Sequence, residues 1–139
     1  MDSRELMRYA IGARANSYAP YSHYNVGAAL LCDDGTVVCG SNIENASYPA
    51  SICAERSAIS AAASSGKRRF LAIAIAGGAE DEKDVLSGYA MPCGICRQVM
   101  REFADPKSFK IYVGRSVDDI KEFTLAELLP ESFGPDHLK

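Results

Sequence analysis

Apolar residues near the start of the chain recur at the three- and four-residue intervals of one helix face. That face and its edge comprise Leu6, Ala10, Ala13, Met7 and Ile11. Ser3 is placed to cap the N-terminus of this helix. The helix should end before Pro20, because a residue that precedes proline avoids helical geometry. The pattern therefore predicts one amphipathic helix before the first strand.

Strand-like segments follow, separated by polar stretches. The predicted strands are 26–32, 36–41, 70–76 and 109–113. The first two form a β-hairpin around Asp34-Gly35, a strong turn signal. The third has the unbroken apolar character of a buried strand. Polar loops are expected at 42–50 and 77–91.

Three more helices are predicted, at 51–66, at 92–104 and from residue 124 onward. Gly66 suits a left-handed C-cap for the first of these, and Pro92 suits the first turn of the second. Thr124 and Glu127 have the spacing of a capping box. A hairpin followed by alternating helices and strands indicates an α/β protein with an α/β/α layered sheet. The 139 residues fit a single domain, 1–139.

The charge balance narrows the range of partners. The net charge of -3 argues against a nucleic acid, because phosphate backbones usually require a basic face. The densest basic run, at 67–69, follows a predicted helix end and is typical of a solvated C-terminus. No apolar stretch reaches the roughly 20 residues of a membrane span, and the first residues lack a secretory signal. We therefore expect a cytoplasmic protein that binds neither nucleic acid nor membrane.

Two of the five cysteines belong to the predicted hairpin. In a tight hairpin Cys32 lies opposite Thr36 or Val37, so Cys32 and Cys39 should not form a disulfide. We interpret both as small core residues of strands. An odd number of cysteines, with no sign of an oxidising compartment, agrees with free thiols.

The other three cysteines indicate a metal site. Cys93 and Cys96 lie three apart in the first turn of a predicted helix, where both sulfurs point to one side. Partial positive charge at a helix N-terminus stabilises thiolates, the metal-binding form. This pair alone also fits a redox dithiol or two core residues. Cys53 begins another predicted helix, and two converging helix N-termini would present three thiolates to one metal.

The number of ligands favours a catalytic zinc site. Structural zinc sites normally have four protein ligands, whereas catalytic sites leave the fourth position to water. His23 lies in an early loop and His137 in the terminal tail, so both are interpreted as surface residues rather than ligands. The main alternative is a non-catalytic zinc module that binds a partner, which would require a fourth protein ligand.

Glu55 is the candidate proton carrier. It lies two residues beyond Cys53, so the two side chains do not share a helix face. Its carboxylate is poorly placed as a ligand, but it could reach a metal-bound water. An isolated glutamate there would be read as a surface residue that stabilises the helix N-terminus. Beside Cys53, the catalytic role is favoured.

The segments C-A-E-R at 53–56 and P-C-G-I-C-R-Q at 92–98 together closely resemble the cytidine deaminase family, specifically its small homotetrameric branch. Further matching segments are A-P-Y-S at 19–22, V-G-A-A at 26–29, N-I-E-N-A at 42–46 and E-L-L-P at 127–130. The resemblance implies a three-layer α/β/α sandwich with a mixed central sheet. It also implies one Zn²⁺ per chain, held by Cys53, Cys93 and Cys96, and hydrolytic deamination of cytidine and deoxycytidine.

In the mechanism that the resemblance implies, zinc-bound hydroxide attacks C4 of the pyrimidine. Glu55 carries a proton from the water to N3 and helps to protonate the leaving ammonia. Three thiolates leave the metal centre with negative charge, which Arg56 would offset by donating to the sulfurs. A plain surface arginine is the alternative. Gln98 resembles the family's supporting amide.

The resemblance also assigns substrate contacts. Asn42 and Glu44, which share a face of an extended segment, resemble a ribose-binding pair. A turn residue and a solvated charge are the alternatives. The other implied contacts are Tyr48 near the ribose, Tyr24 against the base, Ala54, and Phe133 reaching from an adjacent subunit. Tyr24 departs from the phenylalanine that many members carry, and Met91 departs from a common serine.

Two further expectations concern assembly and substrate. Residues 57–65 carry no charge, so a symmetric partner could cover that helix in a homotetramer; an exposed helix in a monomer is the alternative. A nucleotide, a free base, an antibiotic such as blasticidin or a base in RNA are the rival substrates. The acidic charge and the absence of a glycine-rich phosphate loop favour a plain nucleoside.

Overall fold

The computed structural model describes residues 1–139 and is built around one five-stranded mixed sheet of order β2-β1-β3-β4-β5. The strands are β1 (Tyr24–Cys32), β2 (Val37–Ser41), β3 (Phe70–Ala79), β4 (Lys110–Ser116) and β5 (Asp119–Thr124). β3 and β4 run parallel, and every other neighbouring pair is antiparallel. The predicted β1–β2 hairpin is confirmed, and Cys32 faces Thr36 through a backbone hydrogen bond of 2.9 Å.

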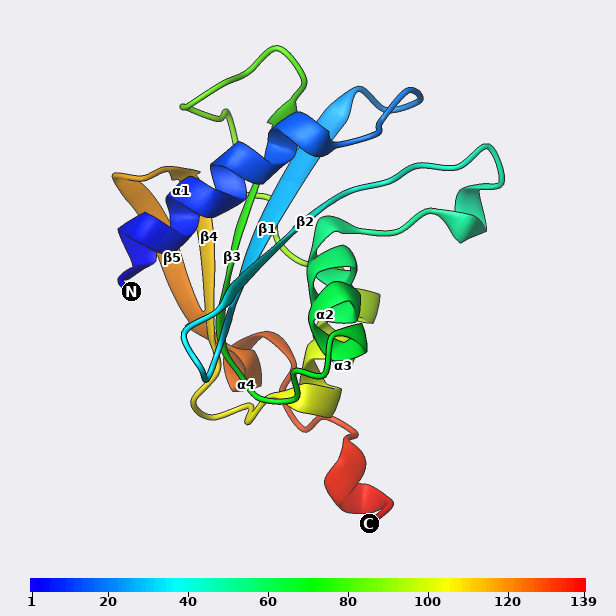
Figure 1. Ribbon diagram of the computed structural model, residues 1–139, viewed down its shortest axis with the longest axis vertical. Helices are drawn as coiled ribbons and strands as arrows, with labels where there is room; N and C mark the ends of the chain where they lie inside the picture. Colours follow the sequence, from blue (N-terminus) through cyan, green and yellow to red (C-terminus); the bar gives the residue numbers. More distant parts are fainter.

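Helices cover both faces of the sheet. Figure 1 shows α1 (Ser3–Ala13) on one face and α2 (Ala54–Ser64) with α3 (Gly94–Phe103) on the other, with the short α4 (Leu125–Leu128) near one end. Alternate residues of β3 serve the two layers: Ala72, Ala74 and Ala76 pack with α1, whereas Ile73 and Ile75 pack towards α2 and α3. The predicted three-layer α/β/α sandwich is confirmed. None of the helices has the length and apolar character that a membrane span requires.

One glycine sets the approach of α2 to the sheet. A Cβ atom on Gly40 of β2 would lie 2.4 Å from both Ala54 O and Ala58 N, far inside van der Waals contact. The absence of a side chain at Gly40 therefore lets the first turn of α2 lie directly on β2. This contact fixes the position of Cys53, which immediately precedes α2.

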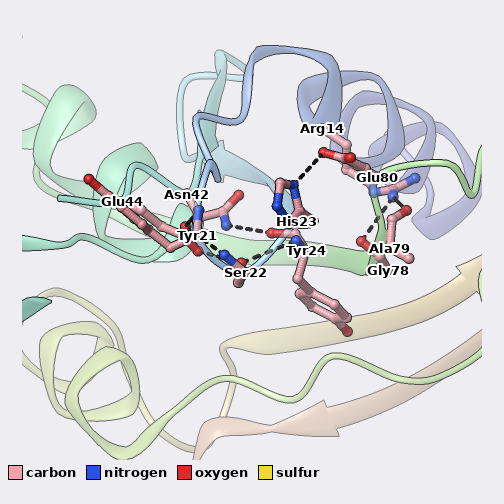
Figure 2. A network of polar contacts seen from close by, with 10 residues as sticks. All are labelled: Arg14, Tyr21, Ser22, His23, Tyr24, Asn42, Glu44, Gly78, Ala79 and Glu80. Carbon is pink, nitrogen blue, oxygen red and sulfur yellow. Dashed lines mark hydrogen bonds and ion pairs between the residues drawn. The ribbon is translucent and has the colours of Figure 1, made fainter. Parts of the chain in front are cut away.

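A buried arginine ties β1 and β3 to the loop that follows β3. Arg14 is 5% exposed, and its guanidinium donates to five backbone carbonyl oxygens at 2.9–3.2 Å. The acceptors are Asn25, Gly78, Ala79, Glu82 and Lys83. Figure 2 shows this cation beside the end of β3. Arg14 therefore supplies hydrogen bonds to main-chain acceptors of both strands and of the loop.

Several predicted element boundaries are wrong. The cap of α1 is Asp2 rather than Ser3, since Asp2 Oδ1 accepts from Glu5 N at 2.9 Å. α2 begins at Ala54 instead of residue 51, because Ile52 pairs with Ile43 in a short bridge. α3 begins at Gly94 and Pro92 lies outside it, because Cys93 in its extended conformation is the N-cap.

The sheet also differs from prediction at its ends. β3 continues through Gly77 and Gly78, which pair with Val26 and Asn25 of β1 although glycines read as a loop signal. β5 was not predicted, because Asp119–Thr124 is a partly exposed edge strand without apolar alternation. Cys39, expected in the core, is exposed on the edge strand β2, whereas Cys32 is buried. The turn at Gly66 has the expected positive φ, 99°.

Candidate metal centre and adjoining pocket

Two helix N-termini bring three sulfurs together. Cys53 is the N-cap of α2 and Cys93 is the N-cap of α3, while Cys96 lies in the first turn of α3. Cys93 Sγ lies 3.9 Å from Cys53 Sγ and 3.5 Å from Cys96 Sγ. All three sulfurs lie within 4.8 Å of one another. The structure thus gathers the three predicted ligands from segments forty residues apart.

The spacing of these sulfurs fits zinc. A tetrahedral zinc ion with Zn–S bonds of about 2.3 Å holds its sulfurs about 3.8 Å apart. The group contains no histidine or carboxylate and no fourth cysteine. Three thiolates with a free fourth position correspond to the ligand count of catalytic rather than structural zinc sites.

Hydrogen bonds and an arginine prepare Cys53 for ionisation. A hydrogen bond with Cys96, followed by one from Arg56, lowers the pKa of Cys53. The same bond between Cys53 and Cys96, together with burial, raises the pKa of Cys96. Arg56 Nη2 donates to Cys53 Sγ across 3.4 Å. Arg56 Nε is buried without a partner. Such a donor fits a site that gains negative charge when the other sulfurs lose their protons.

Glu55 occupies the second position of α2 and is 4% exposed. Burial raises the pKa of its carboxyl to about 7, and the nearby Cys53 charge adds to the effect. A carboxyl with this pKa can accept or release a proton near neutral pH. A metal cation beside it would act in the opposite direction and favour the carboxylate.

The loop before α3 is anchored close to the sulfurs. Arg97 Nε donates to Pro92 O at 2.8 Å, and Arg97 Nη1 donates to Leu128 O at 2.7 Å. The hydroxyl of Tyr89 donates to Asp119 at 2.7 Å, which ties the same loop to β5. These contacts hold the chain on the N-terminal side of Cys93.

A cavity of about 560 Å³ opens beside the sulfurs. Its walls include nine of the residues singled out from the sequence, namely Cys53, Cys93, Glu55, Arg56, Ala54, Asn42, Glu44, Tyr24 and Tyr48. Sequence reasoning missed apolar walls at Val26, Ala90 and Ile95, and it treated Met91 only as a departure from the family pattern. Met91 lies two residues before Cys93, and Ile95 lies between Cys93 and Cys96, so proximity to the motif was the available signal.

Asn42 and Glu44 lie together at the rim but are bound to backbone. Asn42 Nδ2 donates to Tyr24 O at 2.8 Å, and its Oδ1 accepts from Val26 N at 2.9 Å. Glu44 Oε1 accepts from Tyr21 N at 3.0 Å and from Ser22 N at 3.1 Å, as Figure 2 shows. The Ser22 hydroxyl also donates to Glu44 Oε2. This bond, followed by those from the backbone, lowers the pKa of Glu44. The carboxylate therefore stays charged and keeps room for one more donor.

Two predicted residues lie away from the cavity. Gln98 makes no hydrogen bond to the sulfurs; its Nε2 donates to Phe133 O at 2.9 Å in the C-terminal tail. Phe133 is 58% exposed and stacks on His137, with ring centroids 5.3 Å apart. Figure 1 shows this tail extending away from the sheet. Within one chain, Phe133 does not complete the pocket. His23 and His137 are exposed and lie outside the sulfur group.

Comparison with known proteins connects this geometry to a family. Residues 1–112 match the family model described as the cytidine and deoxycytidylate deaminase zinc-binding region. A cytidine deaminase of Halalkalibacterium halodurans is 48% identical over 133 residues, which cover 96% of this chain and 95% of the relative. One from Mycobacterium tuberculosis is 40% identical over 139 residues, covering 99% and 94%.

Solved structures agree with these sequence relationships. The crystal structure of a cytidine deaminase from Burkholderia pseudomallei superimposes with a TM-score of 0.85 at 40% identity, covering 96% of this chain and all of the other. The Mycobacterium tuberculosis enzyme gives a TM-score of 0.79 at 39% identity, covering 96% and 98%. Because the family model matches residues 1–112 and cytidine deaminases align over nearly the whole length, the chain belongs to the cytidine and deoxycytidylate deaminase family of enzymes.

Proposed function

We propose that this enzyme hydrolyses cytidine and deoxycytidine to uridine and deoxyuridine, with one zinc ion held by Cys53, Cys93 and Cys96. The observation that carries the proposal is the buried Glu55 beside a three-sulfur group that opens into a cavity. A closed zinc module that binds a partner protein explains neither the free fourth position nor the buried carboxyl. The relatives that match over nearly the whole chain are cytidine deaminases.

Zinc, when bound, supplies the Lewis acidity that activates water in such sites. Hydrolysis forms a C–O bond at C4 of the cytosine ring and breaks the C–N bond to the exocyclic amine. One proton of the water goes to ring N3 and the other leaves with ammonia. Glu55 carries both protons, since its carboxyl is buried at the cavity beside the three sulfurs. Arg56 neutralises part of the thiolate charge through Cys53.

The cavity suits a nucleoside without phosphate. Glu44 offers a charged acceptor for a sugar hydroxyl, and Asn42 lies beside it. The same carboxylate would repel a phosphate group. Arg56, the one cation among the lining residues, is engaged with Cys53. Tyr24 and Tyr48 line the same cavity and supply aromatic surface.

The active form is proposed to be a homotetramer with shared sites. Phe133 and Tyr48 are 58% and 71% exposed in the isolated chain, and large exposed aromatic residues are typical of surfaces that a partner covers. On α2 the exposed residues include Ser60, Ala61 and Ser64, small side chains that allow close helix approach. Ala62 is fully buried within the chain, so it belongs to the core and not to this surface.

One assay tests the enzymatic proposal. Metal content is measured on the purified protein, and product formation is followed for cytidine, deoxycytidine, cytosine and CMP. We expect about one zinc per chain, uridine and ammonia in equal amounts, and turnover of both nucleosides far above that of CMP. Equal specificity constants for cytidine and CMP would contradict the nucleoside assignment. Absence of uridine from the zinc-loaded protein would contradict the reaction itself.

A further inference from the structure

The backbone of Tyr24 is held on both sides by the side chains of Ser22 and Asn42. Its N–H donates to Ser22 Oγ at 3.1 Å, and its carbonyl oxygen accepts from Asn42 Nδ2 at 2.8 Å. Tyr24 begins β1, so these bonds lie where the regular ladder is only starting. The next residue, Asn25, is held by Arg14 at 2.9 Å. The position of the Tyr24 ring in the cavity thus depends on specific side-chain bonds.

The segment before Tyr24 has an uncommon backbone conformation. His23 has φ 57°, in the left-handed region that residues with a side chain seldom adopt. Its N–H donates to Ala19 O at 3.0 Å, its carbonyl oxygen accepts from Glu80 N at 2.9 Å, and its ring contacts Glu80 at 3.3 Å. A conformation of this kind persists only when its surroundings hold it. The hydrogen bond from the Tyr24 N–H to Ser22 Oγ connects the two residues on either side of His23.

Ser22 also contacts the rim carboxylate. Its hydroxyl donates to Glu44 Oε2, and its backbone N–H donates to Glu44 Oε1 at 3.1 Å. A hydroxyl has one proton to donate and can accept through its oxygen. Donation to Glu44 therefore directs that proton away from Tyr24 and leaves the oxygen free to accept from the Tyr24 N–H. Figure 2 shows the resulting chain from Glu44 through Ser22 to Tyr24.

The Tyr24 ring has a firm surface on its other side. A Cβ atom on Gly77 would lie 3.1 Å from Tyr24 Cε2 and 2.6 Å from the Ala90 methyl carbon. The ring therefore lies close over the Gly77 backbone, beside another residue of the cavity wall. A small displacement of the Tyr24 backbone would change how the ring packs over Gly77 and how it faces the cavity.

We propose that Ser22 is a positioning residue whose hydroxyl couples the sugar-facing carboxylate of Glu44 to the base-facing ring of Tyr24. This inference rests on the proposed nucleoside function of the pocket. Ser22 itself lies outside the cavity lining and acts through its two neighbours. A sugar hydroxyl that binds Glu44 thereby steadies the aromatic surface on which the base packs. Loss of the Ser22 hydroxyl should weaken nucleoside binding more than it slows the chemical step.

The test compares Ser22→Ala, Ser22→Cys and Ser22→Thr with the wild type, all zinc-loaded. Ser22→Ala should raise KM for cytidine about 5- to 20-fold, while kcat changes less than about threefold and zinc content stays the same. Ser22→Thr, which keeps the hydroxyl, should restore KM to within about threefold of wild type. Ser22→Cys keeps the shape but weakens both bonds, so its KM should lie between.

Two further measurements separate coupling from a general loss of stability. In a Glu44→Gln background, which breaks the charged link, Ser22→Ala should raise KM much less than it does alone. Ser116→Ala is the matched control, because Ser116 Oγ accepts from the N–H two residues later at 3.2 Å, in the hairpin of β4 and β5. It should leave KM unchanged.

The outcomes are distinguishable from failure of the proposed function. If the wild type forms no uridine from cytidine, the function is wrong whatever Ser22 does. If the wild type is active and Ser22→Ala raises KM less than about threefold, the positioning role is wrong. The same conclusion follows if Ser22→Thr shows the defect of Ser22→Ala, or if the defect persists in full in the Glu44→Gln background.

Discussion

Arg56 lies one helical turn after Cys53 and donates a hydrogen bond to its sulfur across 3.4 Å. The cation therefore supports a proposed zinc ligand at the start of its own helix, and the hydrogen bond with the Cys53 thiolate raises the pKa of Arg56 further above its ordinary value. Stabilisation of a sulfur in this way strengthens its hold on a metal, because only the thiolate binds.

Arg56→Gln should weaken zinc binding. Loss of a residue that supports a ligand typically lowers metal affinity by about 10- to 100-fold, and we expect an effect of this size. Competition with a colorimetric zinc chelator measures it without reference to activity. Arg69→Gln, at an exposed site, is the control and should bind zinc like the wild type. Equal zinc affinity in Arg56→Gln and wild type would show that Arg56 has no role at the metal.

Glu55→Gln should abolish turnover but keep the metal. The amide fills the same buried space without carrying a proton, so kcat should fall by more than about 10⁴-fold, since one group serves several proton transfers. Zinc should stay near one per chain, measured by atomic spectroscopy. Glu102→Gln, on the exposed side of α3, is the control. Zinc loss from the Glu55 variant would mean that this carboxylate is a ligand.

Shared sites should be detectable by mixing inactive chains. Glu55→Gln and Phe133→Ala homotetramers are each expected to be inactive, whereas mixed tetramers should regain part of the activity. Regain is expected because some sites then combine an intact Glu55 with a neighbour's intact Phe133. Mass spectrometry under native conditions verifies the mixing. Verified mixed tetramers without activity would contradict the shared site.

The assembly itself is tested on the exposed face of α2. Ala61→Lys should dissociate the tetramer and abolish activity while zinc is initially retained, because Ala61 faces outward and a lysine there opposes close helix packing. Sedimentation measures the assembly state, and Ala61→Ser is the control. A fully active Ala61→Lys monomer would rule out the proposed dependence on neighbours.

Arg14→Lys should lower stability without removing the charge. Lysine has three donors on one nitrogen and cannot reach the five separated carbonyls that Arg14 binds. We expect the free energy of unfolding to fall by about 2–4 kcal/mol, measured in urea at fixed protein and zinc concentration. Arg8→Lys, exposed on α1, should change it little. A loss under about 1 kcal/mol would mean that water replaces the missing donors.

Local patterns in the sequence predicted the layers of the fold and the group of three cysteines, whereas the resemblance to the deaminase family supplied most of the other residues of the cavity wall. Apolar periodicity marks α1, β1 and β3, and the spacing of Cys93 and Cys96 is visible in the chain itself. The edge strand β5 could not be predicted, because it is a strand through its pairing with β4 and not through its own composition. The exposure of Cys39 could not be predicted for a related reason. Cys39 is exposed on β2, an edge strand, and the position of a strand at an edge depends on the order of strands in the sheet.

The polar network at the rim could not be predicted either. Ser22 and Glu44 are distant in sequence, and only the folded loop brings the hydroxyl to the carboxylate. The hydrogen bond from the Gln98 side chain to Phe133 O likewise depends on where the C-terminal tail lies in the folded chain. Zinc stoichiometry, the deoxycytidine activity, the single-domain assignment and the cytoplasmic location stay predictions.

The helix caps limit how this enzyme can be made more thermostable. The N-caps of α2 and α3 are cysteines whose side chains do not bond to the helix N–H groups, whereas Asp2 and Thr124 do so for α1 and α4. Exchange of a poor cap for Ser or Asp is a common route to about 1 kcal/mol of stability. At positions 53 and 93 that route would remove a proposed metal ligand. An engineer must therefore leave the two least well capped helices as they are and look for stabilising changes elsewhere, away from the sulfurs.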